Sequence, residues 1–205
     1  MSVSPPKAVV FDLGKVLLDF DYSILVHRMA PRSRMSEAEL NQLLNQAPLL
    51  LRYETGALST PEFFDEVQSA SGFNGSIEEF TAFFADIFTP IEPMIALHAQ
   101  LRSRGVPTYI FSNTNDIAIV HIRRTFPFFA DFDGYVLSYE HSAMKPDAPL
   151  YAVVEGITGL READLLYIDD RHENITAGAA RGWNAILHQE PATTEAVMRA
   201  TGLLG

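Results

Sequence analysis

The chain has 205 residues, which suits one domain or one domain with a small second one. It is 47% hydrophobic and 20% charged, with a net charge of −11 and no cysteine. This composition excludes disulfides and thiolate chemistry, disfavours nucleic acid and anionic membranes as partners, and offers no apolar run near the ~20 residues of a membrane span. The first seven residues lack the basic and then apolar pattern of a secretion signal, so we expect a cytoplasmic protein.

The first predicted element is a buried strand within residues 8–16. Its apolar run begins at Ala8 and ends abruptly on Asp12, and Gly14 follows two residues later. Such a run suits the interior of a parallel sheet that is covered on both faces, where ligands bind just beyond the strand ends. Taken alone, Asp12 could equally start a turn or cap a helix.

From about residue 22 to about residue 90 the pattern is helical and requires no strand. Ser36 and Ser76 each open a Ser-x-x-Glu capping box, the second leading into a helix that extends through Phe88, while Thr60-Pro61 begins another helix that Gly72 closes. Seven of the fourteen phenylalanines fall between residues 63 and 88. Their helical spacing favours the core of a small helical bundle over a ligand-binding aromatic box.

Helices and strands alternate from Pro93 onward. We expect strands at residues 107–111, 135–138, 165–168 and 185–188, with helices at 94–104, around 117–121, at 149–157, 174–181 and 194–204. Repeated strand-helix-strand units imply right-handed crossovers and a parallel sheet. The fold class is therefore α/β, a three-layer core around a parallel sheet of at least five strands, with a small helical unit inserted after the first strand.

Polar groups follow three later strands, as Asp12 follows the first. Ser112 and Asn113 come after one strand, Lys145 lies in the loop after the next, and the pair Asp169-Asp170 follows a third. Individually these residues could be helix caps or, for Lys145, a solvated loop residue. Parallel strands place all these ends along one edge of the sheet, which favours a common site.

Several carboxylates with one lysine and one hydroxyl describe a site for a hard cation and a phosphate group. The carboxylates would repel one another and a phosphate dianion unless Mg²⁺ lay between them. An Asp carboxylate can then attack phosphorus and form an aspartyl-phosphate intermediate, which water hydrolyses. The metal, the ammonium and the hydroxyl would stabilise the transferring oxygens.

The sequence resembles the four motifs of the haloacid dehalogenase-like (HAD) hydrolase superfamily in four segments, namely Phe11-Asp-Leu-Gly14, Phe111-Ser-Asn-Thr-Asn115, Lys145-Pro146 and Ile168-Asp-Asp170. The resemblance covers nearly the whole chain. Its order and spacing are similar to the subgroup with a small helical cap, including α-glucose-1-phosphate phosphatases and the phosphatase half of soluble epoxide hydrolases. It implies a Rossmann-like catalytic core formed by residues 1–18 and 91–205, and a helical cap formed by residues 19–90.

The resemblance also implies a role for each acidic motif residue. Asp12 would be the nucleophile and a metal ligand, and the Gly14 carbonyl would be a second ligand. Asp170 would bind Mg²⁺, with Asp169 binding it as well or assisting nearby. The implied function is a Mg²⁺-dependent phosphomonoester hydrolase that acts on a small phosphorylated metabolite such as a sugar phosphate.

The remaining implied roles concern the phosphoryl group and the leaving group. Ser112 and Asn113 would hold the phosphoryl group, and Lys145 would neutralise it. The helical cap would close over the leaving group and select it. Arg52 and Glu54 are candidate cap contacts, although a solvated helix end explains them equally well.

One departure from the family pattern concerns proton transfer. Most phosphatases of this superfamily carry a second Asp two residues after the nucleophile as general acid and base, and that position is Gly14 here. Glycine cannot shuttle a proton. The groups that could replace it are water, Asp19, Asp21, Glu54 and His172, and for His172 a plain surface-loop position is favoured.

Two other functions fit parts of the pattern. A 2-haloacid dehalogenase would use the same Asp nucleophile on carbon without a metal, but the acidic pair Asp169-Asp170 argues against it. A phosphate-binding protein with little turnover would follow from the loss of the acid at Gly14. Metal-dependent release of phosphate separates both from a phosphatase.

Overall fold

The computed structural model describes residues 5–45 and 48–204. The first four of the seven residues in which we expected no secretion signal lie outside the described residues. Its central sheet has five strands in the order β5-β4-β1-β6-β7, and every neighbouring pair is parallel. The strands are β1 (Ala8–Phe11), β4 (Thr108–Ser112), β5 (Gly134–Leu137), β6 (Leu165–Asp169) and β7 (Asn184–Leu187). The predicted parallel sheet is confirmed.

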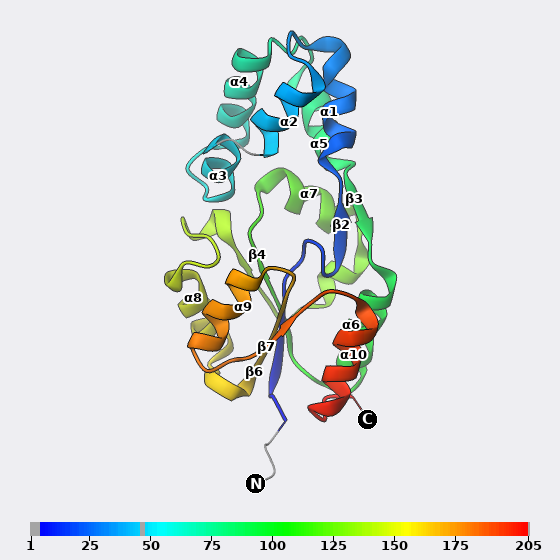
Figure 1. Ribbon diagram of the computed structural model, residues 1–205, viewed down its shortest axis with the longest axis vertical. Helices are drawn as coiled ribbons and strands as arrows, with labels where there is room; N and C mark the ends of the chain where they lie inside the picture. Colours follow the sequence, from blue (N-terminus) through cyan, green and yellow to red (C-terminus); the bar gives the residue numbers. More distant parts are fainter. Residues whose placement is uncertain (1–4, 46–47, 205) are drawn as a thin grey trace.

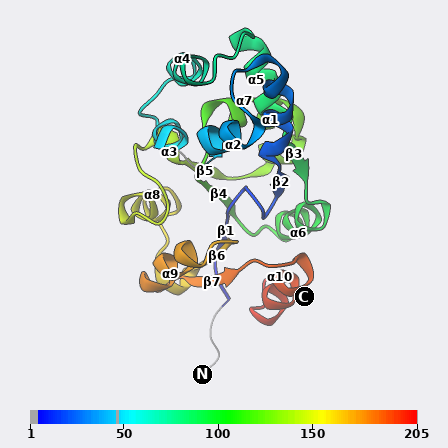
Figure 2. The ribbon, with the colours of Figure 1, turned by 45° about the horizontal axis from the view of Figure 1, so that its top comes forward.

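Helices cover both faces of this sheet, as Figures 1 and 2 show, and complete the three predicted layers. One face carries α6 (Glu92–Ser103), α7 (Asp116–Thr125) and α10 (Pro191–Ala200), and the other carries α8 (Ala148–Thr158) and α9 (His172–Ala180). Short 3₁₀ turns connect several elements: η1 (Ala30–Arg32), η2 (Pro127–Asp131), η3 (Ser138–Glu140) and η4 (Glu162–Asp164). Among the described residues, no helix is both long and apolar enough to span a membrane.

The central strand β1 explains why its sequence is apolar throughout. Ala8 and Val10 pack into the hydrophobic cluster on the α8 side, whereas Val9 and Phe11 pack into the cluster on the α6 side. All four are fully buried, because alternate side chains of a strand point to opposite faces and both faces are covered. The strand ends at Phe11, and the next residue, Asp12, stays buried at the carboxyl edge of the sheet.

Five helices follow β1 and form a separate bundle at the carboxyl edge of the sheet, which we call the helical insert (Figure 1). They are α1 (Tyr22–Met29), α2 (Glu37–Asn45), α3 (Pro48–Glu54), α4 (Thr60–Ser71) and α5 (Ile77–Ala85). The core of the insert includes five buried phenylalanines, Phe63, Phe64, Phe73, Phe80 and Phe84. Packing of the insert therefore accounts for most of the aromatic run. Ser59 and Ser76 cap α4 and α5 through complete capping boxes, and Gly72 ends α4 in a left-handed conformation.

The prediction that residues 22–90 need no strand is wrong at the C-terminal end of that range, because the segment Phe88–Pro90 is a strand. Two short antiparallel strands, β2 (Leu18–Phe20) and β3 (Phe88–Pro90), connect the insert to the core. The helix predicted to continue through Phe88 ends at Ala85. Phe88 instead lies opposite Phe20 across the strand pair, with ring centroids 6.3 Å apart. The spacing of the phenylalanines could not reveal the end of the helix. Phe84 and Phe88 are four residues apart, and this separation places two side chains on the same side of a helix and also on the same face of a strand.

The helical insert should depend on Phe63 for its stability. Phe63 is fully buried and stacks on Tyr53 with ring centroids 4.3 Å apart. We expect Phe63→Ala to lower the free energy of unfolding by about 3–5 kcal/mol, because truncation of a buried aromatic leaves a cavity. Urea unfolding followed by circular dichroism measures the change. Leu51→Ala is the control, since Leu51 is 54% exposed and its loss should change stability by less than about 0.5 kcal/mol; equal effects of the two substitutions would contradict this packing.

Candidate active site

The carboxyl ends of three strands bring two carboxylates and one ammonium together. Asp12 follows β1, Asp169 ends β6, and Lys145 lies in the loop between η3 and α8. Lys145 Nζ lies 2.8 Å from Asp12 Oδ1 and 2.7 Å from Asp169 Oδ2. All three side chains are at most a tenth exposed, so this is a buried charge cluster.

Lys145 is held in place by its backbone as well as by its ammonium group. Its Nζ also donates to the Phe111 carbonyl at 2.8 Å. This carbonyl is the third partner of the ammonium group, after the Asp12 and Asp169 carboxylates. Asn113 clamps the backbone, because its Oδ1 accepts from Lys145 N at 2.8 Å and its Nδ2 donates to the Lys145 carbonyl at 3.0 Å. The side chain of Asn113, which we expected to hold a phosphoryl group, is thus occupied in fixing the lysine loop.

Asp169 is saturated with hydrogen bonds. Its Oδ2 accepts from Lys145 and from the Tyr167 hydroxyl at 2.5 Å, and its Oδ1 accepts from Arg171 N at 2.8 Å. Asn174 Nδ2 lies within reach of both oxygens, at 3.0 and 3.1 Å. Among the described residues, no such set of side chains surrounds Asp170. Asp169 is therefore built to position its neighbours, while Asp170 keeps a carboxylate that is available to a ligand.

Electrostatics distinguish the buried carboxylates. Burial raises the pKa of Asp12 to about 7, although Lys145 opposes the shift. Burial also opposes ionisation of Asp169, but the adjacent ammonium and its hydrogen bonds outweigh it and lower the pKa. The pKa of Asp170 is raised by burial and by the charge of Asp169. Burial disfavours the Lys145 ammonium too, yet its two carboxylate neighbours raise its pKa. The cluster therefore holds more negative than positive charge when fully ionised.

One oxygen of Asp12 remains available for chemistry. Its Oδ1 accepts from Leu13 N at 2.7 Å and pairs with Lys145, whereas no described residue bonds to Oδ2. No buried side-chain oxygen among the described residues lacks a partner, so this oxygen is accessible. The preorganised orientation of Asp12 fits a nucleophile.

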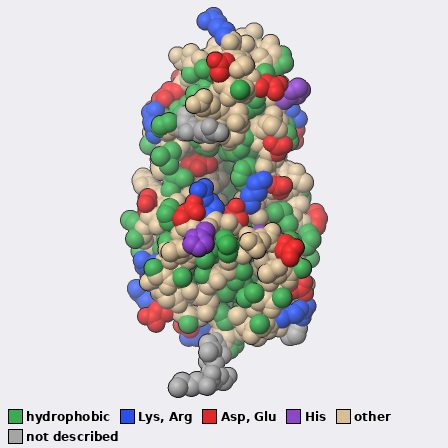
Figure 3. All heavy atoms as spheres, viewed as in Figure 1, with side chains coloured by type: hydrophobic (Ala, Val, Ile, Leu, Met, Phe, Trp, Pro, Cys, Tyr) green, Lys and Arg blue, Asp and Glu red, His purple; other side chains and the backbone are tan. Residues whose placement is uncertain are grey.

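A cavity adjoins this cluster between the core and the helical insert. Gly14, Ser112 and Asn113 line it from the core, and Glu54 lines it from the insert. Figure 3 shows the molecule hollowed between its two parts, with acidic and basic side chains gathered at the opening. The predicted residues Gly14 and Ser112 thus line the same cavity, and Ser112 is almost fully buried.

The chemistry of the donor set fits a divalent cation. Asp12, Asp169 and Asp170 each offer a carboxylate oxygen, and these oxygens lie within 4.8 Å of one another. Clustered carboxylates with one counter-charge favour a hard cation, and Mg²⁺ prefers carboxylate and carbonyl oxygens. Because Asp169 already accepts several hydrogen bonds, Asp12 and Asp170 have the greater capacity to bind the ion.

The auxiliary residues proposed from the sequence separate into two groups. Arg52 is not among the residues that line the cavity, and it pairs with Glu66 on α4 through two bonds of 2.8 and 2.9 Å. His172 is exposed at the start of α9, with its ring near Thr176 of the same helix. Glu54 alone of these three lines the cavity. His172 is exposed as expected, but it is the first residue of a helix and not part of a loop, and Arg52 is about half exposed in its ion pair.

Sequence reasoning missed the aromatic residues of this region. Phe20, Tyr22 and Phe88 line the cavity, and Tyr167 donates to Asp169 from within β6. Residues two apart in a strand lie on the same face, so the spacing of Tyr167 and Asp169 could have predicted that their side chains are neighbours. The cavity aromatics had no such signal, because they meet through the unpredicted pairing of β2 with β3.

Comparison with known proteins places this geometry in a family. The profile of the haloacid dehalogenase-like hydrolases matches residues 6–182. A curated relative, the sesquiterpene phosphatase astK of Aspergillus oryzae, is 26% identical over 179 residues, which cover 86% of each chain. The sequence-based identification of this superfamily is confirmed.

Solved structures share the fold at lower identity. The HAD family enzyme bt-2542 of Bacteroides thetaiotaomicron, in complex with magnesium and inorganic phosphate, superposes with a TM-score of 0.79 at 23% identity, covering 90% of this chain and 94% of that one. L-2-haloacid dehalogenase of Xanthobacter autotrophicus gives a TM-score of 0.63 at 19% identity, covering 97% and 86%. Both phosphate-binding and dehalogenating relatives therefore use this architecture, and the fold alone does not select between them.

Removal of one carboxylate should weaken metal binding. We expect Asp170→Asn to raise the Mg²⁺ concentration that half-saturates the protein by about tenfold or more, because a neutral amide replaces a charged ligand. Mg²⁺-dependent thermal stabilisation measures binding without any substrate. Asp147→Asn is a control outside the cluster, and an identical Mg²⁺ titration for Asp170→Asn and the unmodified protein would remove Asp170 from the site.

Proposed function

The chain belongs to the haloacid dehalogenase-like hydrolases, and we propose that it is a Mg²⁺-dependent phosphomonoester hydrolase acting through an aspartyl-phosphate intermediate. The observation that carries this proposal is the cluster of Asp12, Lys145 and Asp169, with Asp170 beside it, at the edge of the sheet. It supplies an oriented nucleophile, a fixed positive charge and acidic groups that suit a metal. The family relative that is a sesquiterpene phosphatase supports the same reaction class.

The proposed metal ligands are Asp12, the Gly14 carbonyl and Asp170. Asp169 would assist mainly by fixing Lys145, since its oxygens already accept hydrogen bonds from Lys145 and Tyr167. When bound, Mg²⁺ neutralises the clustered negative charge and polarises the phosphoryl oxygens. These two proposed roles agree with the surroundings of the adjacent aspartates: Asp169 accepts several hydrogen bonds, and Asp170 keeps a carboxylate that is available to a ligand.

The reaction would then proceed on residues of this chain. Asp12 Oδ2 attacks phosphorus while the ester oxygen leaves, and Lys145 with Ser112 holds the transferring oxygens. Water next hydrolyses the aspartyl-phosphate and frees Asp12. The rigid clamp on Lys145 supports this role, because fixed charges require no reorganisation during the reaction.

The helical insert would act as the cap that contacts the leaving group. The motif arrangement favours a sugar phosphate as the small phosphorylated metabolite. A second candidate is the phosphate of an apolar alcohol, because the cavity lining is mostly hydrophobic: Leu13, Leu18, Phe20, Phe88, Ala118 and Ile122. The cavity measures about 60 Å³, so a bulky leaving group would require the insert to shift.

The nucleophile substitution tests the proposed intermediate. Asp12→Asn should abolish phosphate release, because an amide is a poor nucleophile and a poor Mg²⁺ ligand. Phosphate is measured by colorimetry with an activated aryl phosphate, and circular dichroism checks the fold. Residual activity above a few per cent of the unmodified rate would exclude Asp12 as the nucleophile.

Metal dependence separates the phosphatase from the alternatives. Phosphate release from a panel containing glucose 1-phosphate, glucose 6-phosphate and a short prenyl phosphate should require Mg²⁺ and stop with a chelator, while 2-haloacids release no chloride. The ratio of kcat/KM between the sugar and prenyl phosphates decides between the two substrate candidates. Metal-independent chloride release would favour a dehalogenase, and absence of any turnover would favour a phosphate-binding protein.

A further inference from the structure

The space beside Gly14 is filled by an aromatic ring. A Cβ atom at this position would lie 2.9 Å from Cε1 of Phe20, which is closer than real Cβ contacts. Gly14 is not among the described residues with positive φ, so the ring, and not the backbone conformation, is the constraint. A carboxyl group two residues after Asp12 would collide with Phe20, and the proton for a leaving oxygen must come from elsewhere.

Most of the acidic or basic groups near the site are already occupied. Asp19 is exposed and accepts hydrogen bonds from the Lys15 ammonium and from Phe20 N. Asp21 caps α1 by accepting from Ser23 N at 2.8 Å. His172 faces solvent on α9. These positions leave Glu54 as the one carboxyl group of the helical insert that lines the cavity among the described residues.

Glu54 shares the cavity with the phosphoryl-binding edge of the core. It lines the same cavity as Gly14 and Ser112, and no hydrogen bond or ion pair occupies its carboxyl group among the described residues. The rest of the lining is mainly apolar, which keeps a carboxyl group neutral more readily than water does. Glu54 lines this cavity from the helical insert and Gly14 lines it from the core, so the Glu54 carboxyl group is available to a leaving oxygen bound between them.

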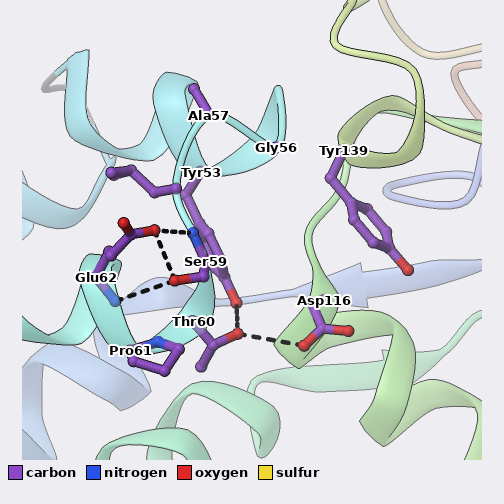
Figure 4. Close-up of a pocket in the computed structure, with 10 residues that line it drawn as sticks. Tyr53, Gly56, Ala57, Ser59, Thr60, Pro61, Glu62, Asp116 and Tyr139 are labelled. Carbon is purple, nitrogen blue, oxygen red and sulfur yellow. Dashed lines mark hydrogen bonds between the residues drawn. The ribbon is translucent and has the colours of Figure 1, made fainter.

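The end of α3 is tied directly to the core, which fixes Glu54. Ser138 Oγ donates to the Glu54 carbonyl at 2.6 Å and accepts from Thr114 N at 2.9 Å. The preceding Tyr53 lies in a hydrogen-bonded chain that Figure 4 shows: its hydroxyl contacts Thr60 Oγ1 at 2.7 Å, and Thr60 donates to Asp116 of α7 at 3.2 Å. Core groups thus hold both the residue and its neighbour.

The turn after Glu54 requires close approach to the core. Gly56 adopts φ +72°, and a Cβ there would lie 2.2 Å from the Tyr139 carbonyl oxygen. Only glycine fits this left-handed turn against the backbone of η3. The segment from Tyr53 to Gly56 is therefore docked on the core by side-chain hydrogen bonds and by the close approach of Gly56, and these contacts support the Glu54 side chain.

We propose that the Glu54 carboxyl group donates the proton to the leaving oxygen, in place of the carboxyl group that Gly14 lacks. The inference rests on the phosphatase function proposed above. As the Asp12 oxygen bonds to phosphorus and the ester P–O bond breaks, the leaving oxygen takes the Glu54 proton and departs as an alcohol. In the second step, water gives a proton to the Glu54 carboxylate and attacks phosphorus, which releases hydrogen phosphate and regenerates both carboxyl groups in their initial states.

The surroundings of Glu54 suit both halves of this cycle. Burial raises the pKa of Glu54 to about 7, and the nearby Arg171 charge lowers it in part. Tyr22 faces the same group, and its own pKa is raised by burial and by the Glu54 charge, so it stays neutral. A group that titrates near neutrality can serve as an acid and then as a base. Because the donor must be protonated, turnover of esters with poor leaving groups should fall as pH rises above about 7.

The test is Glu54→Gln, assayed with Mg²⁺ on phosphomonoesters graded from acidic aryl to alkyl leaving groups. We expect alkyl esters to lose about 10²–10⁴-fold in kcat while the most acidic aryl esters change little, and the decline above pH 7 to disappear. Glu54→Asp should keep that pH dependence, since it keeps a carboxyl group. Asp65→Asn, an exposed carboxylate on α4, is the matched control and should leave the leaving-group dependence unchanged.

Two further measurements keep the outcomes separate. Mg²⁺ binding by Glu54→Gln should equal that of the unmodified protein, which excludes a collapsed site. Gly14→Asp combined with Phe20→Leu, which makes room for the new carboxyl group, should restore alkyl ester turnover to Glu54→Gln. If the unmodified protein turns over esters but Glu54→Gln keeps the same leaving-group dependence and pH profile, the role of Glu54 is overturned; if the unmodified protein releases no phosphate from any ester, the phosphatase function itself fails.

Discussion

A buried ammonium group is the interaction on which the site depends. Two carboxylates at most a tenth exposed, Asp12 and Asp169, face each other across the ends of neighbouring strands. Without Lys145 between them, burial and mutual repulsion would force at least one of them to bind a proton. Lys145 favours the ionised form of both carboxylates; it lowers the pKa of Asp169 below its usual range, whereas burial still leaves the pKa of Asp12 at about 7. The lysine therefore sets the charge balance of the cluster, including that of Asp12, the proposed nucleophile.

The parallel sheet makes this cluster possible. Strands β4, β1 and β6 are adjacent and end at the same edge, so this edge holds Phe111 next to the last residue of β4, Asp12 after β1 and Asp169 at the end of β6. Lys145 comes from a loop beyond β5, and the two hydrogen bonds of Asn113 hold that loop against the end of β4. Polar residues that would be isolated on separate loops thus become one rigid unit. Rigidity matters here because electrostatic stabilisation is largest when charges are fixed before the reaction.

The sequence predicted those parts of the fold and site that short segments specify. Asp12, Ser112 and Asp169 adjoin apolar runs, so strand prediction also placed them at one edge. Local sequence patterns could not predict which distant residues tertiary packing brings together. The pairing of β2 with β3 puts Phe20 beside Gly14, and no local pattern signals that contact. From the sequence, Arg52 and Glu54 were equal candidates for contacts of the cap. The structure separates them, because Arg52 pairs with Glu66 whereas Glu54 lines the cavity.

The ring of Phe20 and the docking of α3 belong to one arrangement. Phe20 lies on the strand that leads into the helical insert, so the same segment fills the space beside Gly14 and lines the leaving-group cavity. The proposed role of Glu54 would combine leaving-group contact and proton donation in one element, α3. A leaving group that forces α3 away from Ser138 would also move the donor away from its oxygen. A substrate with an unsuitable leaving group would then both bind less well and react more slowly. Discrimination between substrates would therefore include the chemical step as well as binding, as expected when an enzyme distinguishes substrates by their transition states.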